Sequence, residues 1–120
     1  MQNENGKSVF YAKTRADWRK WLEKNHQSEP SVWLIIYHKD NPVQSINYEE
    51  AVEEALCFGW IDNKANKRDS SSYYQIFTKR KPKSNWSQSN KARAEKMIQL
   101  GLMTPSGQHA IDLAKKAGTW

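Results

Sequence analysis

The spacing of apolar residues predicts a helix followed by a buried strand in the first third of the chain. Trp18, Trp21 and Leu22 recur at helical spacing behind Thr14, whose hydroxyl is placed to cap the first turn. This helix is expected to end near residue 25, because the Glu-Pro pair at 29–30 breaks it. The continuous apolar run at 32–37 is rich in β-branched and aromatic residues, which is typical of a strand buried on both faces.

A second helix is predicted to begin after Asn47, which has Glu50 three residues further on, as in a capping box. Its buried stripe is expected to consist of Tyr48, Val52, Ala55 and Leu56. The glutamates at 49, 50, 53 and 54 are expected on the other side of the helix, with Glu54 facing solvent. Gly59 is a suitable stop for this helix.

The second half of the chain reads as two extended segments and then two helices. The segments begin at Trp60 and cover 72–78, with a turn at 68–71 between them and a basic loop at 79–83 behind them. Ser84 or Ser87 is expected to cap the first helix, which ends at the glycine at 101. Thr104 and the proline after it open the last helix, which runs to the glycine at 118.

These elements predict an α+β fold in the order α-β-α-β-β-α-α. About four helices are expected to cover a small, mainly antiparallel sheet. Residues 10–120 are interpreted as a single domain, and the polar residues 1–9 as a flexible leader.

Composition narrows the class of protein. The chain has 120 residues, of which 38% are hydrophobic, as in a soluble globular domain. Its longest apolar run has six residues, so no membrane insertion is expected. No secretory signal opens the sequence, and one cysteine, Cys57, cannot form an internal disulfide, so a cytoplasmic location is expected.

The net charge of +6 arises in one part of the chain. Residues 62–96 hold ten basic and three acidic side chains, whereas the rest of the chain holds nine basic and ten acidic ones. A field concentrated in this way attracts anions such as phosphorylated metabolites, nucleic acid or an acidic partner surface.

The same region supplies the candidate ligand-binding residues, because basic side chains alternate there with aromatic and hydroxyl ones. The set consists of Asp62, Arg80, Lys81, Lys83, Ser84, Trp86, Ser87 and Asn90. Trp60 and Phe77 are expected in the core instead, and Cys57 is expected to be a small buried group. The three histidines lack ligand spacing and no nucleotide-loop or hydrolase motif is present, so no metal, cofactor or catalytic residue is predicted.

Three segments of the chain are similar to a known family. The string ALCFGWID at 55–62, the segment from Phe77 to Asn90 and the string GLMTPSG at 101–107 resemble the YdeI/OmpD-associated, or bacteriocin-protection, family. The resemblance implies a small α+β domain, loosely grouped with YjbR/CyaY-like domains, and a role in tolerance of bacteriocins or antimicrobial peptides. It brings no catalytic residues.

The chain departs from this family at two places. Lys79 stands where the family usually has proline, which makes the loop more basic. Family members continue beyond the position of Trp120, so the resemblance implies that the C-terminal helical segment is lacking here.

Three functions are consistent with the sequence. The first is a non-enzymatic cytosolic domain whose basic-aromatic surface binds an anionic ligand or acidic partner, with nucleic acid as one candidate. The second is an enzyme that acts on a small phosphorylated or carboxylated metabolite, with Asp62 as acid/base, Arg80 as anion clamp and Ser84 as an orienting hydroxyl. The third is a protein-interaction module anchored by exposed tryptophans. The sequence leaves the oligomeric state open.

Overall fold

The chain folds around one mixed β-sheet, described by a computed structural model for residues 2–4 and 7–120. Within these residues the sheet has five strands in the order β1-β2-β3-β5-β4, and every neighbouring pair is antiparallel except β2 and β3. The strands are β1 (Gln2–Glu4), β2 (Lys7–Tyr11), β3 (Ser31–Tyr37), β4 (Trp60–Lys67) and β5 (Ser72–Lys79). The helices are α1 (Arg15–Asn25), α2 (Tyr48–Leu56), α3 (Gln88–Gln99) and α4 (Pro105–Ala117). The α+β class is confirmed, and the predicted order holds from α1 onward.

Residues 1–9 were predicted to form a flexible leader, but part of this segment belongs to the sheet. Residues 2–4 and 7–11 are strands, while residues 1, 5 and 6 of the predicted leader lie outside the described residues. The reason is that β2 pairs in parallel with β3 and buries Val9 on the sheet. The strand has three large residues in succession, Val9, Phe10 and Tyr11, without the alternation that indicates a half-buried strand, so its own pattern did not predict it.

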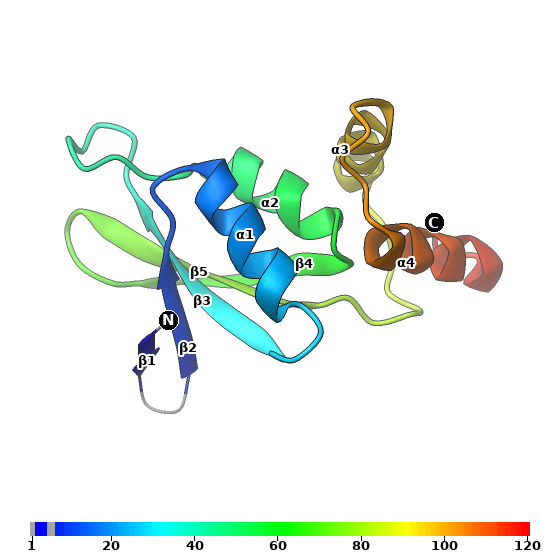
Figure 1. Ribbon diagram of the computed structural model, residues 1–120, viewed down its shortest axis with the longest axis horizontal. Coiled ribbons are helices and arrows are strands. Elements are labelled where there is room, and N and C mark those ends of the chain that lie inside the picture. Colours follow the sequence, from blue (N-terminus) through cyan, green and yellow to red (C-terminus); the bar gives the residue numbers. More distant parts are fainter. Residues whose placement is uncertain (1, 5–6) are drawn as a thin grey trace.

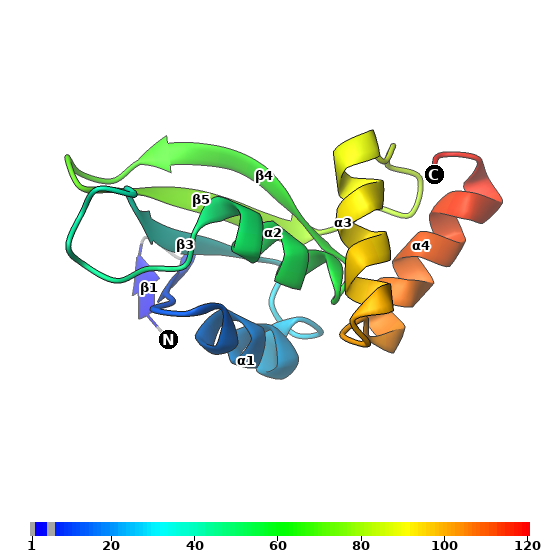
Figure 2. The same ribbon diagram turned by 90° about the horizontal axis from the view of Figure 1, so that it is seen from above.

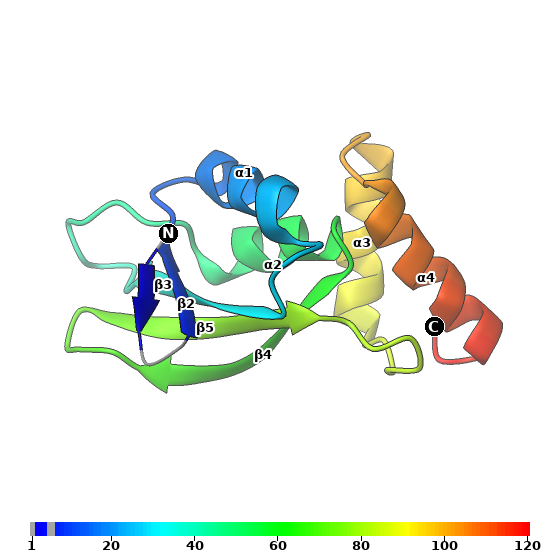
Figure 3. The ribbon, with the colours of Figure 1, turned by 60° about the horizontal axis from the view of Figure 1, so that its bottom comes forward.

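The helices form two groups around the sheet. Helices α1 and α2 lie on one face of the sheet, and α3 and α4 lie side by side beyond the end at which β4 begins and β5 ends (Figures 1 and 2). The opposite face of the sheet carries no helix within the described chain (Figure 3). Two helices thus cover the sheet, and the other two extend the core past its end.

The core lies between the sheet and α1 and α2, and a cluster of aromatic rings lies within it. Trp18 stacks on Trp21 and packs against Phe77, and Trp21 meets Trp60 edge to face. Trp60 and Phe77 are fully buried, as predicted. Such large rings give a small domain much of the apolar area that it buries.

Side-chain caps start all four helices as the sequence predicted. Thr14 accepts a hydrogen bond from the Asp17 N–H at the start of α1. Asn47 and Glu50 form a reciprocal capping box on α2. For α3 the cap is Ser87, not Ser84, and Thr104 caps α4 in front of its proline.

The two glutamates near the end of α2 contradict the sequence-based prediction. Glu53 and Glu54 are buried, with only 3% and 2% of their surface exposed, and Glu54 does not face solvent. Helix α2 lies between α1 and α3 and has contacts with both, so this side of the helix is not free. Buried carboxylates need cationic partners, and these come from both neighbouring helices.

The partners form a compact ion-pair network. Arg15 bridges Glu53 and Glu54, with its Nη2 2.8 Å from an oxygen of each. Arg19 lies 2.8 Å from the second oxygen of Glu54, and Lys96 on α3 lies 2.8 Å from Glu53. Burial alone would raise the pKa of Glu53, but Lys96 and Arg15 together outweigh it and lower the pKa below its usual range.

We predict that Glu53→Gln lowers the free energy of unfolding by about 1–3 kcal/mol at pH 7, because charge-assisted hydrogen bonds to Arg15 and Lys96 are weakened. A carboxylate with a lowered folded-state pKa contributes stability above its unfolded pKa and loses it as the pH falls through the folded value. The wild type should therefore lose stability below about pH 4.5, and the variant should lose less.

Urea unfolding at a series of pH values measures both effects. Glu23→Gln is the control. Glu23 is exposed and lies 3.8 Å from Arg19, and such a surface ion pair contributes about 0–1 kcal/mol. Equal losses in the two variants would show that the network does not stabilise the fold.

Candidate functional site

The basic loop leaves the sheet at a fixed point. Trp60 at the start of β4 pairs with Lys79 at the end of β5, and the Arg80 N–H then donates to the Gly59 carbonyl at 2.9 Å. The Ser84 N–H closes a turn on the Lys81 carbonyl at 3.1 Å. These hydrogen bonds hold the loop between the end of the sheet and the α3–α4 pair.

Arg80 is fixed against an aromatic ring. Its Cζ lies 3.8 Å from the centroid of the Trp86 ring, and its Nη2 donates to the Asn85 carbonyl at 2.7 Å. Trp86 is itself buried and packs on Trp120, with ring centroids 4.9 Å apart. A guanidinium over an indole face is a favourable cation–π geometry. Burial lowers the pKa of Arg80 to about 10, although the nearby charge of Asp62 acts in the opposite direction.

A hollow of about 310 Å³ lies beside this guanidinium, and we call it the Arg80 hollow. Four predicted binding residues line it, namely Asp62, Arg80, Lys81 and Ser84. Two buried polar atoms, Arg80 Nε and Ser84 Oγ, have no hydrogen-bond partner in the described part of the chain. Because buried polar groups in native proteins are nearly always partnered, this pair indicates a place for a bound molecule or water.

Asp62 also lines the Arg80 hollow, and a tyrosine holds its carboxylate. The Tyr48 hydroxyl donates to Asp62 Oδ2 at 2.7 Å. Burial, and then the hydrogen bond and charge of Asp62, raise the pKa of Tyr48 to about 12. Arg93 lies over the Tyr48 ring at 6.0 Å and pairs with Glu49. The hydrogen bond from Tyr48 therefore orients one carboxylate oxygen of Asp62.

The remaining predicted site residues have other positions. Lys83 is exposed and does not line the Arg80 hollow. Ser87 caps α3 by accepting from the Asn90 N–H, and Asn90 Oδ1 accepts from Arg93 at 2.7 Å. The ring of Trp86 packs against the Arg80 guanidinium. The structure thus brings four of the eight residues to one hollow, with Trp86 as their support.

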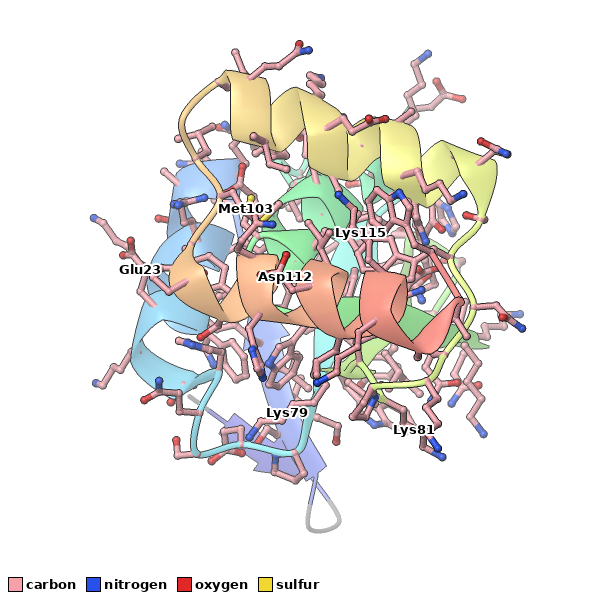
Figure 4. All side chains as sticks on the ribbon, turned by 90° about the vertical axis from the view of Figure 1, so that its right-hand side faces the viewer. Glu23, Lys79, Lys81, Met103, Asp112 and Lys115 are labelled. Atoms are coloured by element: carbon pink, nitrogen blue, oxygen red, sulfur yellow. The ribbon has the colours of Figure 1, made fainter. Side chains whose placement is uncertain are left out.

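A second hollow of about 370 Å³ shares Lys79, Arg80 and Lys81 with the first, and we call it the His26 hollow. Its other lining residues include His26, Ser106 and His109, together with apolar side chains such as Phe58, Trp60 and Leu113. In Figure 4 the side chains of Lys79 and Lys81 lie along the side of α4 that faces away from α3.

His26 and Ser106 form a hydrogen-bonded pair in this hollow. His26 Nε2 lies 3.1 Å from Ser106 Oγ, and His26 Nδ1 lies 2.7 Å from the Leu22 carbonyl oxygen. Sequence reasoning missed this pair, because its members are 80 residues apart and no local motif connects them. Only the N-cap and proline before Ser106 could have shown that its hydroxyl lies in the first turn of a helix.

Two glycines allow this first turn of α4 to pack closely on the end of α2. Gly59 has a φ of +77°, and a Cβ there would lie 3.1 Å from the Ser106 carbonyl oxygen. At Gly107 a Cβ would lie 2.3 Å from the Cys57 carbonyl oxygen. A side chain at either position would therefore disturb the close packing that positions Ser106.

The thiol and most of the tryptophans have packing roles in the core. Cys57 is buried, as predicted, and burial raises the pKa of its thiol to about 11. Four tryptophans, at 18, 21, 60 and 86, are buried, which weakens the reading of tryptophans as exposed anchors. Over residues 2–4 and 7–120, no three His, Cys, Asp or Glu side chains are grouped as a metal site would need. No helix in that part of the chain has the length and apolar character for crossing a membrane.

Fold and site together define a small α+β domain in which an aromatic-backed arginine lies between two hollows. The chain belongs to the family described as a domain of unknown function (DUF8412), which matches residues 10–110. Neither curated proteins nor solved structures show a significant match to it.

We predict that Arg80→Met leaves the melting temperature unchanged or raises it. Since the folded-state pKa of Arg80 lies below its ordinary value, folding disfavours its charged form at all pH values below about 10. Methionine removes that cost and keeps an apolar chain against Trp86.

Arg19→Met is the matched comparison, because Arg19 also lies over an aromatic ring, 5.0 Å from the centroid of Phe58. Burial alone would lower the pKa of Arg19, but Glu54 raises it, so its loss should lower the melting temperature by several degrees. Thermal unfolding followed by circular dichroism measures the melting temperatures of both variants. A similar fall in melting temperature in both would contradict the prediction that the charge of Arg80 destabilises the fold.

Proposed function

We propose that this protein is a cytosolic binding domain that takes a small anionic ligand in the Arg80 hollow. The observation that carries the proposal is a pair of partnerless buried atoms, Arg80 Nε and Ser84 Oγ, in two residues that line one hollow. A partly buried guanidinium that has no carboxylate at ion-pair distance in the described chain is costly, and an anion would supply its missing acceptor.

The shape of the hollow narrows the class of ligand. Arg80 and Lys81 offer positive charge, and Ser84 offers a hydroxyl. Asp62 adds a carboxylate to the same lining, which suits a hydrogen-bond donor such as a sugar hydroxyl and repels a second anionic group. The best fit is a small molecule that carries a phosphate or carboxylate next to a hydroxyl or amine.

The enzyme reading places Asp62 in the same hollow as an acid/base. Its hydrogen bond from Tyr48 holds one carboxylate oxygen in place as an acceptor, which favours a binding role for this residue. We therefore assign Asp62 to ligand orientation, with no reaction at this position.

The sequence resemblance to bacteriocin-protection proteins adds a proposed context, tolerance of bacteriocins or antimicrobial peptides in the cytoplasm. In that context the ligand would be a small metabolite, and the free thiol of Cys57 agrees with a reducing compartment.

We predict that phosphorylated sugars and nucleoside monophosphates raise the melting temperature of the wild type, and that Arg80→Met and Ser84→Ala each abolish this rise. Loss of a charge-assisted hydrogen bond should weaken binding roughly tenfold or more in Arg80→Met. Scanning fluorimetry with inorganic phosphate, sugar phosphates, nucleotides and dicarboxylates identifies the ligand, and isothermal titration calorimetry measures its affinity.

Lys83→Met is the control for charge alone, because Lys83 belongs to the same loop, is exposed and lies outside the hollow. It should bind the ligand as the wild type does. Equal weakening in Lys83→Met and Arg80→Met would show nonspecific attraction and contradict a specific site.

A separate titration with single-stranded oligonucleotides tests nucleic acid. If phosphates of a strand bind, log affinity should fall with log salt by about 0.7 per phosphate neutralised. Tight oligonucleotide binding that Arg80→Met leaves unchanged would replace the small-ligand proposal with a nucleic-acid surface.

A further inference from the structure

The His26 hollow contains a second arrangement of groups, which the binding proposal does not use. A carbonyl oxygen can only accept, so the 2.7 Å contact between His26 Nδ1 and the Leu22 carbonyl requires the proton of a neutral imidazole to be on Nδ1. Nε2 is then the free acceptor, and the Ser106 hydroxyl donates to it at 3.1 Å. A hydroxyl, a base and a group that orients the base are the parts of an activated nucleophile.

We propose that Ser106 and His26 act as a nucleophile–base pair that hydrolyses small carboxylic esters with an anionic acyl group. The reacting hydroxyl and the imidazole both line the hollow, so a substrate bound there can reach Ser106. The proposal goes beyond ligand binding and places an activity at a different hollow from the one that contains Asp62 and Ser84.

The other walls of the hollow indicate the class of substrate. Lys79, Arg80 and Lys81 provide positive charge for a carboxylate on the acyl part. Phe58, Trp60 and Leu113 provide apolar surface for the alcohol part. Ser106 lies in the first turn of α4, where the positive end of the helix stabilises negative charge that develops on the attacked carbonyl.

The reaction balances with water alone as co-reactant. Ser106 Oγ attacks the ester carbonyl carbon and its proton passes to His26 Nε2. The bond to the alcohol oxygen then breaks, and the leaving alcohol takes that proton. Water attacks the acyl-serine and gives a proton to Nε2, the Oγ–acyl bond breaks, and Oγ takes the proton back. Ester and water become acid and alcohol, with no change of oxidation state.

A structural explanation of the same contact must be tested against this one. In that explanation the hydrogen bond between His26 and Ser106 only joins the C-terminal end of α1 to the first turn of α4. The two explanations differ in the reactivity that they give the atom at position 106, and reactivity is measurable without knowing the substrate.

The first experiment is covalent labelling with an alkyl fluorophosphonate, read by intact mass and peptide mapping. Labelling should occur at Ser106, disappear in Ser106→Ala, and slow at least tenfold in His26→Gln. Ser89→Ala is the matched control, because Ser89 is also the second residue of its helix but has Ser87 and not a histidine as its side-chain partner. Labelling that spares Ser106 or marks Ser89 equally would overturn the proposal.

Ser106→Cys keeps the test decisive if the alanine variant unfolds. With His26 as its base, the new thiol should react with iodoacetamide at pH 7 at least tenfold faster than in the double variant Ser106→Cys/His26→Gln. Cys57 does not compete, since it is buried and burial raises its pKa to about 11. His38→Gln, which replaces an exposed histidine stacked on Tyr73, should leave the rate unchanged.

The substrate class is tested with two activated esters. The wild type should hydrolyse mono-p-nitrophenyl succinate at least tenfold faster than p-nitrophenyl acetate, and Lys79→Met with Lys81→Met should remove this preference. Equal rates for both esters in the wild type would contradict an anionic acyl group. Lys83→Met, which changes an exposed side chain outside both hollows, should keep the ester activity. The ester assay contains no ligand for the Arg80 hollow, so failure of the binding proposal and failure of this one remain distinguishable.

Discussion

The hydrogen bond from the Arg80 N–H to the Gly59 carbonyl is the link on which both hollows depend. It extends the β4–β5 ladder by one step beyond the last strand pair, at the point where the chain turns away from the sheet. Gly59 also lies directly below the first turn of α4, so the same short segment positions the arginine and the helix that carries Ser106. The basic loop is therefore anchored to the rigid part of the fold and is not a free surface loop.

The partly buried arginines have two kinds of surroundings, one with ion-pair partners and one without. Arg15 and Arg19 reach two buried glutamates, and every charge in that network has a close partner. Arg80 has an indole ring, one carbonyl and an unfilled donor. The first arrangement stabilises the packing of α1, α2 and α3. The surroundings of Arg80 are expected to lower the stability of the ligand-free protein. Such a cost is typical of residues that bind a ligand.

What could be predicted from the sequence was local. The N-caps of all four helices, the buried strand β3 and the core positions of Trp60 and Phe77 follow from neighbours within a few residues. Glu53 and Glu54 were placed wrongly because helical periodicity cannot show that α3 returns to cover their side of α2. Strand β2 was missed for a similar reason, since its pairing partner lies about 24 residues later.

The candidate site was predictable only in part, for the same physical reason. Arg80, Lys81 and Ser84 meet at one hollow because they are close along the chain, and the pairing of β4 with β5 brings Asp62 to them. The contact between His26 and Ser106 joins two helix ends across most of the sequence and leaves no local trace. Residue types and charge therefore pointed to the region, but only tertiary structure could reveal a second hollow.

Arg80 connects the two hollows physically, because its guanidinium lines both of them. A guanidinium has five N–H donors in a fixed plane, and the described contacts use one of them on Asn85. An anion bound at Arg80 in one hollow would add negative charge beside the other hollow, because Arg80 lines both. The two hollows share one source of positive charge, so a ligand in the first alters the electrostatic environment in which Ser106 and His26 lie.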